Sequence, residues 1–321
     1  MSFIYALLFL LAAMLLAAHL YTRKIKGQVE AAMPPQGRFI DVPGARLHVV
    51  EKGAGPPLLL IHGLMGNLCN YTYGVVDRLS GRYRVIAVDR PGSGYSVRHD
   101  GTAADLPTQA DAMAALIDAL KLDRSPVIVG HSLGGALALC LAQRHPGKVA
   151  ALALLAPLTQ DPGEISPAFN GIRITQPWLQ VLLGWTLAVP VSMRTKDKVL
   201  AVVFGPEAVP ADFGTRGGGL LGVRPTHYVA GCRDLAAAGH GIGDQVAAYA
   251  RMTLPVRVLY GRGDQILNPQ VQGQGLVDAL PGATLELIDG GHMIPITAPQ
   301  ACADFIARVA DEAATPAARA A

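Results

Sequence analysis

Hydrophobic and polar positions divide the chain into an apolar N-terminal run and a longer alternating part. Phe3 to Leu20 is almost unbroken apolar sequence, and as a helix it would span roughly 27 Å, close to the hydrocarbon thickness of a bilayer. Tyr5 and Tyr21 lie near its two ends, where aromatic residues commonly mark the membrane surface. We therefore predict a transmembrane anchor helix at residues 1–21, with the lipid bilayer as its partner.

A cleaved signal peptide is the competing interpretation of this run. Such peptides usually have a basic leader, a shorter apolar core and a small-residue cleavage site, whereas this run has no Lys or Arg ahead of it and no convincing cleavage site. An uncleaved anchor fits better. Arg23, Lys24 and Lys26 follow the run, and the positive-inside tendency then favours a cytoplasmic catalytic domain, although a folded domain can cross regardless.

Past a predicted polar linker at residues 22–37, strand-like and helix-like periodicities alternate. Arg38–Val42 and Arg46–Val50 are split by Pro43-Gly44, which predicts an antiparallel hairpin. From Pro57 onward the alternation predicts a mainly parallel central sheet with helices on both faces, an α/β fold. We expect residues 38–158 and 253–313 to form this core, and residues 314–321 to be a disordered tail.

Residues 159–252 interrupt the alternation and predict a cap or lid insertion. Trp178, Trp185 and the run Val181-Leu182-Leu183 have helical spacing and are expected to form the core of the insertion itself. A sharper hypothesis is that part of this surface lines an apolar acyl pocket or lies against the bilayer. The cluster Gly217-Gly218-Gly219 is expected to be a flexible loop, because no Lys-Ser/Thr pair follows to make a phosphate site.

The motif Gly130-His131-Ser132-Leu133-Gly134 lies between an apolar strand-like run, Pro126–Val129, and a helix-like run, Ala136–Leu139. A G-x-S-x-G sequence in a strand–turn–helix context is where a serine becomes a nucleophile. Gly130 and Gly134 would let neighbouring backbone pass close. We predict Ser132 as the nucleophile, with a plain glycine-rich turn as the alternative.

A serine hydroxyl needs a base, and an imidazole base needs a carboxylate to orient it. Asp264 follows the strand-like run Val256–Tyr260, and His292 follows the strand-like run Thr284–Ile288. The order Ser, Asp, His is one in which such triads occur. The spacing places Asp264 and His292 on adjacent loops at the sheet edge where Ser132 lies, so these three residues are the predicted catalytic triad.

Other acids compete for the middle position. Asp161, which follows the strand-like run Leu152–Leu155, is the alternative acid. The alternative for Asp264 is a purely structural role as the cap of a turn. Asp289 is expected to be a turn residue.

A tetrahedral intermediate also needs donors for its oxyanion. We predict the backbone amides of Leu133, which follows the nucleophile, and Leu64, in the loop after the strand-like run Leu58–Ile61. Gly63 would let that loop turn sharply. His62 and His131 are expected to be structural.

These motifs resemble the α/β-hydrolase superfamily over about residues 38–310, apart from the insertion. The matching segments are His62–Gly66, Asp89–Ser96, Gly130–Gly134, Gly261–Asp264 and Gly290–His292. The resemblance implies that Asp89–Ser96 shapes the floor of the site without a catalytic group. Relatives with an aspartate nucleophile, the haloalkane dehalogenases and epoxide hydrolases, are set aside because this chain has serine there. Esterases, lipases, thioesterases, serine haloperoxidases and carbon–carbon bond hydrolases remain, and the motifs do not separate them.

Composition narrows the partners. The chain has a net charge of +3, with 16% charged and 51% hydrophobic residues. Its Lys and Arg residues form no dense stripe of the kind typical of nucleic-acid-binding proteins, so we expect no nucleic-acid partner. The four cysteines are scattered without a C-x-x-C pair, so neither a zinc site nor a disulfide is suggested. The predicted chemistry requires no metal and no cofactor.

The combined expectation is a membrane-anchored serine hydrolase that cleaves carboxylic esters of apolar acyl or alcohol groups through an acyl-enzyme. The alternatives that keep the triad are a carbon–carbon bond hydrolase, a thioesterase and a cofactor-free haloperoxidase. A non-catalytic protein that uses the fold as a ligand cage is a further, less favoured alternative.

Overall fold

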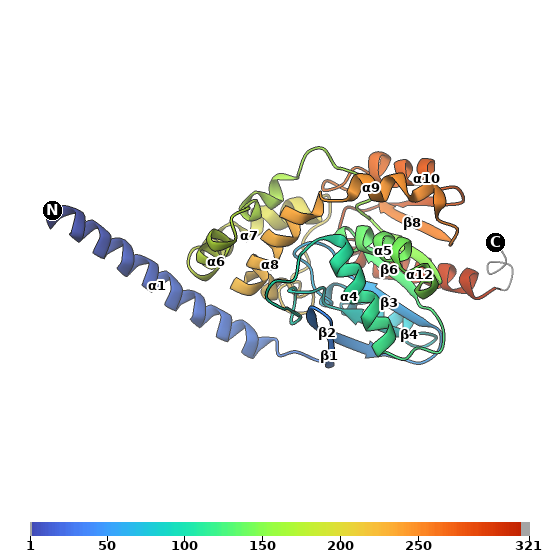
Figure 1. Ribbon diagram of the computed structural model, residues 1–321, viewed down its shortest axis with the longest axis horizontal. Helices are drawn as coiled ribbons and strands as arrows, with labels where there is room; N and C mark the ends of the chain where they lie inside the picture. The colour runs from blue at the N-terminus through green and yellow to red at the C-terminus, as the bar shows by residue number, and fades with distance from the viewer. Residues whose placement is uncertain (1, 316–321) are drawn as a thin grey trace.

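The computed structural model describes residues 2–315 and is built around one nine-stranded sheet (Figure 1). The strand order is β1-β2-β4-β3-β6-β7-β8-β9, and β5 pairs with β2. Pairs made by β2 are antiparallel, and the pairs from β4 to β9 are parallel. The strands are β1 (Arg38–Val42), β2 (Ala45–Lys52), β3 (Pro57–Ile61), β4 (Arg84–Val88), β5 (Val97–Arg98), β6 (Val127–His131), β7 (Ala151–Leu155), β8 (Val256–Gly261) and β9 (Thr284–Ile288).

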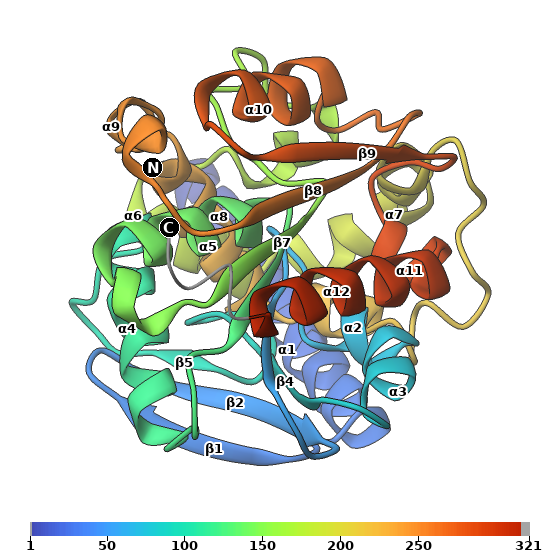
Figure 2. The ribbon, with the colours of Figure 1, turned by 90° about the vertical axis from the view of Figure 1, so that its right-hand side faces the viewer.

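Helices cover both faces of this sheet, as predicted. The α-helices are α1 (Ser2–Ala32), α2 (Cys69–Thr72), α3 (Val75–Leu79), α4 (Leu106–Ala119), α5 (Leu133–Arg144), α6 (Pro177–Trp185), α7 (Ala188–Phe204), α8 (Pro225–Ala238), α9 (Ile242–Ala247), α10 (Gly275–Ala279), α11 (Ile294–Thr297) and α12 (Pro299–Ala314). Helices α4 and α5 pack together on one face, and α3 and α12 pack together on the other (Figure 2). Both faces of the parallel strands are therefore covered, which explains why β3, β6 and β7 are buried at every position.

Helix α4 illustrates how the local sequence sets an element. Its N-cap is Asp105, whose carboxylate accepts a hydrogen bond from the Thr108 N–H at 2.8 Å. Met113, Leu116 and Ile117 have the i, i+3, i+4 spacing of one helix face and are buried. The helix ends just before Lys121, which has a positive φ of 47°, a conformation that does not continue a right-handed helix.

The segment between β7 and β8 carries α6, α7, α8 and α9 together with three short 3₁₀ helices, η2 (Pro167–Ile172), η3 (Gly219–Val223) and η4 (Tyr249–Arg251). Part of it has a hydrophobic cluster of its own, formed by Ile172, Ala188, Tyr228 and Cys232. Its last part does not, because Ile242 and Tyr249 belong to the main hydrophobic core. The predicted insertion, residues 159–252, is thus anchored in the core at its C-terminal end.

The tryptophan prediction for this segment is wrong. Trp178 is 67% exposed, and Val181 and Leu182 on the same helix are exposed as well. Trp185 lies beside His19 of α1, with ring centroids 5.8 Å apart. Apolar residues lie all around α6, and only one face of the helix packs against α8, so the remaining apolar residues face outward.

The predicted linker at residues 22–37 is also corrected. Helix α1 continues without a break to Ala32, and only residues 33–37 connect it to β1. The i,i+4 pair Lys26–Glu30, at 2.7 Å, supports the extra turns, and Pro34 and Pro35 lie just past the point where the helix ends. One part of α1 packs against the body: Thr22 and Val29 are buried, whereas the N-terminal part extends freely into the space beyond it (Figure 1).

The length and composition of α1 are sufficient to cross a membrane. Residues Phe3–Ala32 contain an 18-residue window of mean hydropathy 2.4, none of which is buried. At the other end of the chain, α12 reaches Ala314, so residues 314 and 315 of the predicted tail belong to the described structure and residues 316–321 lie outside it.

Candidate active site

Ser132 lies at a strained turn between β6 and α5. Its φ is 54° and its ψ is −122°, a conformation that costs a non-glycine residue about 1–3 kcal/mol. Three backbone hydrogen bonds fix it: its N–H donates to Leu155 O at 3.1 Å, and its carbonyl accepts from Gly135 N–H and Leu158 N–H. A Cβ at Gly130 would approach Gly134 O to 2.5 Å, so the motif glycines are needed for this close packing.

Asp264 and His292 meet at the carboxyl ends of β8 and β9, as the sequence predicts. The His292 Nδ1 lies 2.7 Å from Asp264 Oδ2, and both side chains are almost completely buried. The other carboxylate oxygen, Oδ1, accepts the N–H groups of Ile266 and Leu267 at 2.8 and 2.9 Å. Both carboxylate oxygens of Asp264 therefore have hydrogen-bond partners, and the orientation of the side chain is fixed before a substrate binds.

His131 links this pair to the serine turn. Its Nε2 hydrogen-bonds the His292 carbonyl at 2.9 Å, and the rings of His131 and His292 lie 4.9 Å apart between centroids. Ser132 and His292 both line one cavity. The structure thus gathers the three predicted triad residues at the same edge of the sheet.

The alternative acids lie elsewhere. Asp161 is exposed, and its Oδ1 accepts the Gly163 N–H at 2.9 Å. Asp289 is fully exposed on the turn after β9. Neither forms a hydrogen bond with His292 among the described residues, so the geometry favours Asp264 as the partner of this histidine.

The loop after β3 packs directly on the serine turn. A Cβ at Gly63 would lie 2.9 Å from the Ser132 Cβ, and Met65 has a positive φ of 54°. The backbone amides of Leu64 and Leu133 donate no hydrogen bond to another group in residues 2–315. Both amides thus lack a hydrogen-bond acceptor within the described residues, as donors reserved for an oxyanion would.

Two polar networks were missed at the sequence level. Arg90 is fully buried and donates to the carbonyls of His62 and Gly63 and to the carboxylate of Asp234 on α8. Asn67 and Asn70 donate to the carbonyls of Gly218 and Gly217. The glycine cluster at 217–219 is therefore tied down rather than a flexible loop. Only the burial that the fold creates brings Arg90 to Asp234 and the two asparagines to the glycine cluster, each across more than 140 positions of sequence.

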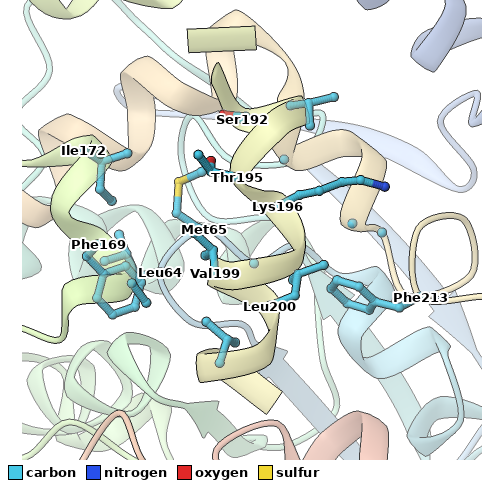
Figure 3. A pocket seen from close by; sticks show the side chains of 18 of the residues that line it. Leu64, Met65, Phe169, Ile172, Ser192, Thr195, Lys196, Val199, Leu200 and Phe213 are labelled. Carbon is cyan, nitrogen blue, oxygen red and sulfur yellow. The ribbon is translucent and has the colours of Figure 1, made fainter. Parts of the chain in front are cut away.

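A cavity of about 900 Å³ extends from Ser132 beneath the insertion. Figure 3 shows its walls: Leu64 and Met65 from the loop after β3, Phe169 and Ile172 from η2, and Val199 and Leu200 from α7. Lys196 is the one Lys or Arg among the described residues that line it. The walls therefore suit an apolar ligand.

Three buried histidines around the site are held neutral. Burial lowers the pKa of His62 and of His131 to about 3, and that of His227 to about 4. His62 illustrates the cause: its Nε2 accepts the Arg90 N–H at 2.9 Å and its Nδ1 donates to Gly63 O at 2.8 Å. This pattern requires the neutral imidazole.

Because of these three histidines, we predict that the free energy of unfolding decreases as the pH falls below 6.5. The unfolded chain protonates each of them near pH 6.5, whereas the folded protein does not until about pH 3–4, so unfolding takes up protons between these limits. Each histidine then contributes a slope of about 1.4 kcal/mol per pH unit below pH 6. We expect the free energy of unfolding in urea to fall steeply between pH 7 and pH 5, where the carboxylates stay ionised.

The matched variants are His227→Gln, at a buried position, and His99→Gln, at an exposed one. The first should reduce proton uptake on unfolding by about one, and the second is the control for a histidine substitution at the surface. Equal slopes for all three proteins would contradict the prediction.

Comparison with known proteins agrees with this architecture. A family model described as alpha/beta hydrolase fold matches residues 56–190. An uncharacterized protein of Mycobacterium tuberculosis (strain ATCC 25618 / H37Rv) is 29% identical over 281 residues, 83% of this chain and 78% of the relative. A 2-hydroxymuconate semialdehyde hydrolase of Pseudomonas sp. (strain CF600) is 36% identical over 124 residues, 38% of this chain and 44% of the relative.

A solved structure also matches over the whole length. It is the structure of a membrane phospholipase A described as a bacterial virulence factor, with 22% sequence identity and a TM-score of 0.62. The match covers 100% of this chain and 99% of the other. At this identity the likeness supports the fold alone. The parallel sheet with its serine turn and the family match together show that the chain has the α/β-hydrolase fold.

Proposed function

We propose that this α/β hydrolase is a membrane-anchored serine hydrolase that cleaves carboxylic esters of apolar acyl or alcohol groups. One observation carries the proposal: the strained Ser132 and His292, which is hydrogen-bonded to Asp264, lie on the wall of the same apolar cavity. A strained turn with a buried Asp–His pair is costly to maintain, and activation of a nucleophile accounts for that cost.

The proposed reaction proceeds through an acyl-enzyme. The Ser132 Oγ attacks the ester carbonyl carbon while His292 accepts the hydroxyl proton at Nε2, and Asp264 stabilises the imidazolium through Nδ1–H. The N–H groups of Leu64 and Leu133 donate to the oxyanion. His292 then protonates the departing alcohol. A water molecule, deprotonated by His292, attacks the acyl carbon; the bond from the acyl carbon to Ser132 Oγ breaks, His292 returns the proton to Oγ, and the acid is released.

The cavity supports an apolar substrate. Among its described walls, aliphatic and aromatic side chains dominate, and Asn67 and Asn70 are occupied by the carbonyls of the glycine cluster. Each buried methylene contributes about 0.8 kcal/mol. In a series of p-nitrophenyl esters we therefore expect kcat/KM to rise by at least about tenfold from acetate to octanoate. Activity confined to acetate would contradict this prediction.

The anchor is supported by the way α1 is fixed to the body. Its His19 Nδ1 lies 3.2 Å from Trp185 O, and the Thr22 hydroxyl donates to Thr186 O at 3.1 Å. Glu30 pairs with the buried Arg224 at 3.3 Å. Contacts of this kind favour a retained helix over a cleaved leader. Carbonate-resistant membrane association that is lost on removal of residues 1–21 would test this part, and Arg23, Lys24 and Lys26 make a cytoplasmic body the expected orientation.

A carbon–carbon bond hydrolase is the second candidate, favoured by the 36% identity to such an enzyme over 124 residues. Both reactions use the same triad, so substrates have to separate them. Turnover of a dienol ketone at a higher kcat/KM than any ester would favour the carbon–carbon reaction. Absence of fluorophosphonate labelling at Ser132 would argue against both and favour a binding protein.

A further inference from the structure

Exposed apolar side chains of the body concentrate on two neighbouring helices. Outside α1, ten large hydrophobic residues are exposed among the described residues, and six of them lie on α6, on α7 or at their junction. These six form what we call the outer cap face: Trp178, Val181, Leu182, Leu187, Val191 and Met193. A cluster of this kind marks a binding surface rather than ordinary surface variation.

The position of α1 indicates which partner the outer cap face contacts. The apolar run of α1 ends at Leu20, and the hydrogen bonds of His19 and Thr22 join that point to the α6–α7 junction at Trp185 and Thr186. If α1 enters a bilayer, the junction lies at the depth where hydrocarbon gives way to headgroups. In Figure 1, α6 and α7 lie on the side of the body toward which the free part of α1 extends.

The basic residues of α7 are consistent with a position at the membrane surface. Arg194, Lys196 and Lys198 are exposed beside the outer cap face, with Asp197 as the one acidic neighbour on that turn. Each basic group near an anionic membrane surface contributes about 1 kcal/mol of attraction. An aromatic and aliphatic face bordered by basic groups is typical of an interfacial helix.

The same face borders the cavity. Leu187, Val191 and Met193 are exposed and also line the cavity that reaches Ser132. We propose that the outer cap face lies in the interface of the bilayer that holds α1, and that lipid esters pass from this bilayer into the cavity between α7 and the body. The proposal rests on the proposed function and names its substrate class as esters dissolved in the membrane.

The test separates membrane position from catalysis. In Ser132→Ala/Trp185→Phe protein, Trp178 is the one remaining tryptophan, and in vesicles of phosphatidylcholine and phosphatidylglycerol with brominated acyl chains we expect its emission to be lost. This readout needs no activity. Retained emission in protein that floats with the vesicles would overturn the proposed position, whereas protein that does not float would overturn the anchor instead.

Substrate entry is tested with Trp178→Asp/Leu182→Asp, which changes two residues that do not line the cavity. We expect turnover of a long-chain ester in vesicles to fall by about tenfold or more, as loss of about 1.4 kcal/mol or more of interfacial contact predicts, while hydrolysis of water-soluble p-nitrophenyl butyrate stays unchanged. Val97→Asp, at an exposed apolar position on β5, is the matched control and should change neither. An unchanged ratio of the two activities in the first variant would overturn entry across this face.

A second inference comes from the buried Arg90 and concerns the oxyanion donors. The Gly63 carbonyl accepts hydrogen bonds from three donors: the Gly66 N–H, the His62 Nδ1–H and the Arg90 guanidinium, at 3.2, 2.8 and 3.2 Å. The Gly63–Leu64 peptide bond is trans, so its carbonyl and its N–H point in opposite directions. Fixing the carbonyl therefore fixes the direction of the Leu64 N–H.

Arg90 is in turn hydrogen-bonded to a residue of the insertion, Asp234 of α8. Its Nη1 lies 2.8 Å from Asp234 Oδ2 and 2.9 Å from Gln109 Oε1, and the second carboxylate oxygen of Asp234 accepts from Arg98. All of these side chains are buried. We infer that Asp234 is a positioning residue: through Arg90 it sets the orientation of the Leu64 amide and thus couples the seating of α8 to oxyanion stabilisation.

Asp234→Asn tests this role, because it keeps the shape and removes the charge. We expect kcat per titrated active site to fall by about tenfold or more with KM unchanged, and the affinity for a trifluoromethyl ketone, which forms an oxyanion on Ser132, to fall by the same factor. Arg98→Lys is the control, since Arg98 contacts Asp234 and the Pro91 carbonyl without touching His62 or Gly63. A lower melting temperature with unchanged kcat per titrated site in Asp234→Asn would overturn the inference without affecting the proposed hydrolase.

Discussion

Replacing Ser132 with alanine is expected to lower kcat for ester hydrolysis by about five to six orders of magnitude. The substitution removes the oxygen that forms the acyl-enzyme, and no other hydroxyl stands at the serine turn to replace it. Turnover should be measured with the best ester of the chain-length series, and fluorophosphonate labelling should disappear in parallel. His292→Ala is expected to have a similar effect, because the hydroxyl then lacks its base.

Folding should be insensitive to the first of these changes. The backbone of residue 132 is held by hydrogen bonds to Leu155, Gly135 and Leu158 that do not involve the side chain, so Ser132→Ala should keep the melting temperature. Ser132→Gly should raise it, because glycine adopts a φ of 54° without strain. A Ser132→Ala protein that retains substantial turnover would end the proposal of a serine nucleophile.

The sequence predicted the parts of the site that follow directly from strand ends. A buried strand followed by a turn places a side chain at the carboxyl edge of a parallel sheet, and this rule predicted where Ser132, Asp264 and His292 lie, after β6, β8 and β9. The structure confirms that Asp264 and His292 are hydrogen-bonded. The parallel sheet with helices on both faces was predictable for the same reason, since fully apolar runs such as β3 need cover on both sides.

Contacts between distant segments could not be predicted in this way. Nothing in the local sequence pairs Arg90 with Asp234, which lies 144 positions later. Trp178 has the spacing of a core residue, and only the packing of α6 on α8 decides that it faces outward. The extension of α1 to Ala32 depends in part on the burial of Thr22 and Val29 against the rest of the protein. This tertiary packing stabilises the helix, and it cannot be read from the polar local sequence of residues 22–32.

Replacing Asp264 with asparagine is expected to lower kcat by about four orders of magnitude, and the structure gives the reason. Asp264 Oδ1 accepts two backbone N–H groups, so an asparagine must keep its carbonyl oxygen at that position and turn its NH₂ group toward His292 Nδ1. Nδ1 then has to be the acceptor, the ring proton moves to Nε2, and the nitrogen that is proposed to take the Ser132 proton no longer accepts one.

The control is Asp161→Asn, at the exposed alternative acid, which should change kcat by less than about twofold because a surface substitution away from the site has little effect. The tautomer argument makes a further distinction. Asp264→Ala leaves Nδ1 without a partner but does not impose the wrong tautomer, so it should retain at least as much activity as Asp264→Asn. Near-normal turnover in Asp264→Asn together with a large loss in Asp161→Asn would transfer the role of the acid to Asp161 and require the loop after β7 to approach His292.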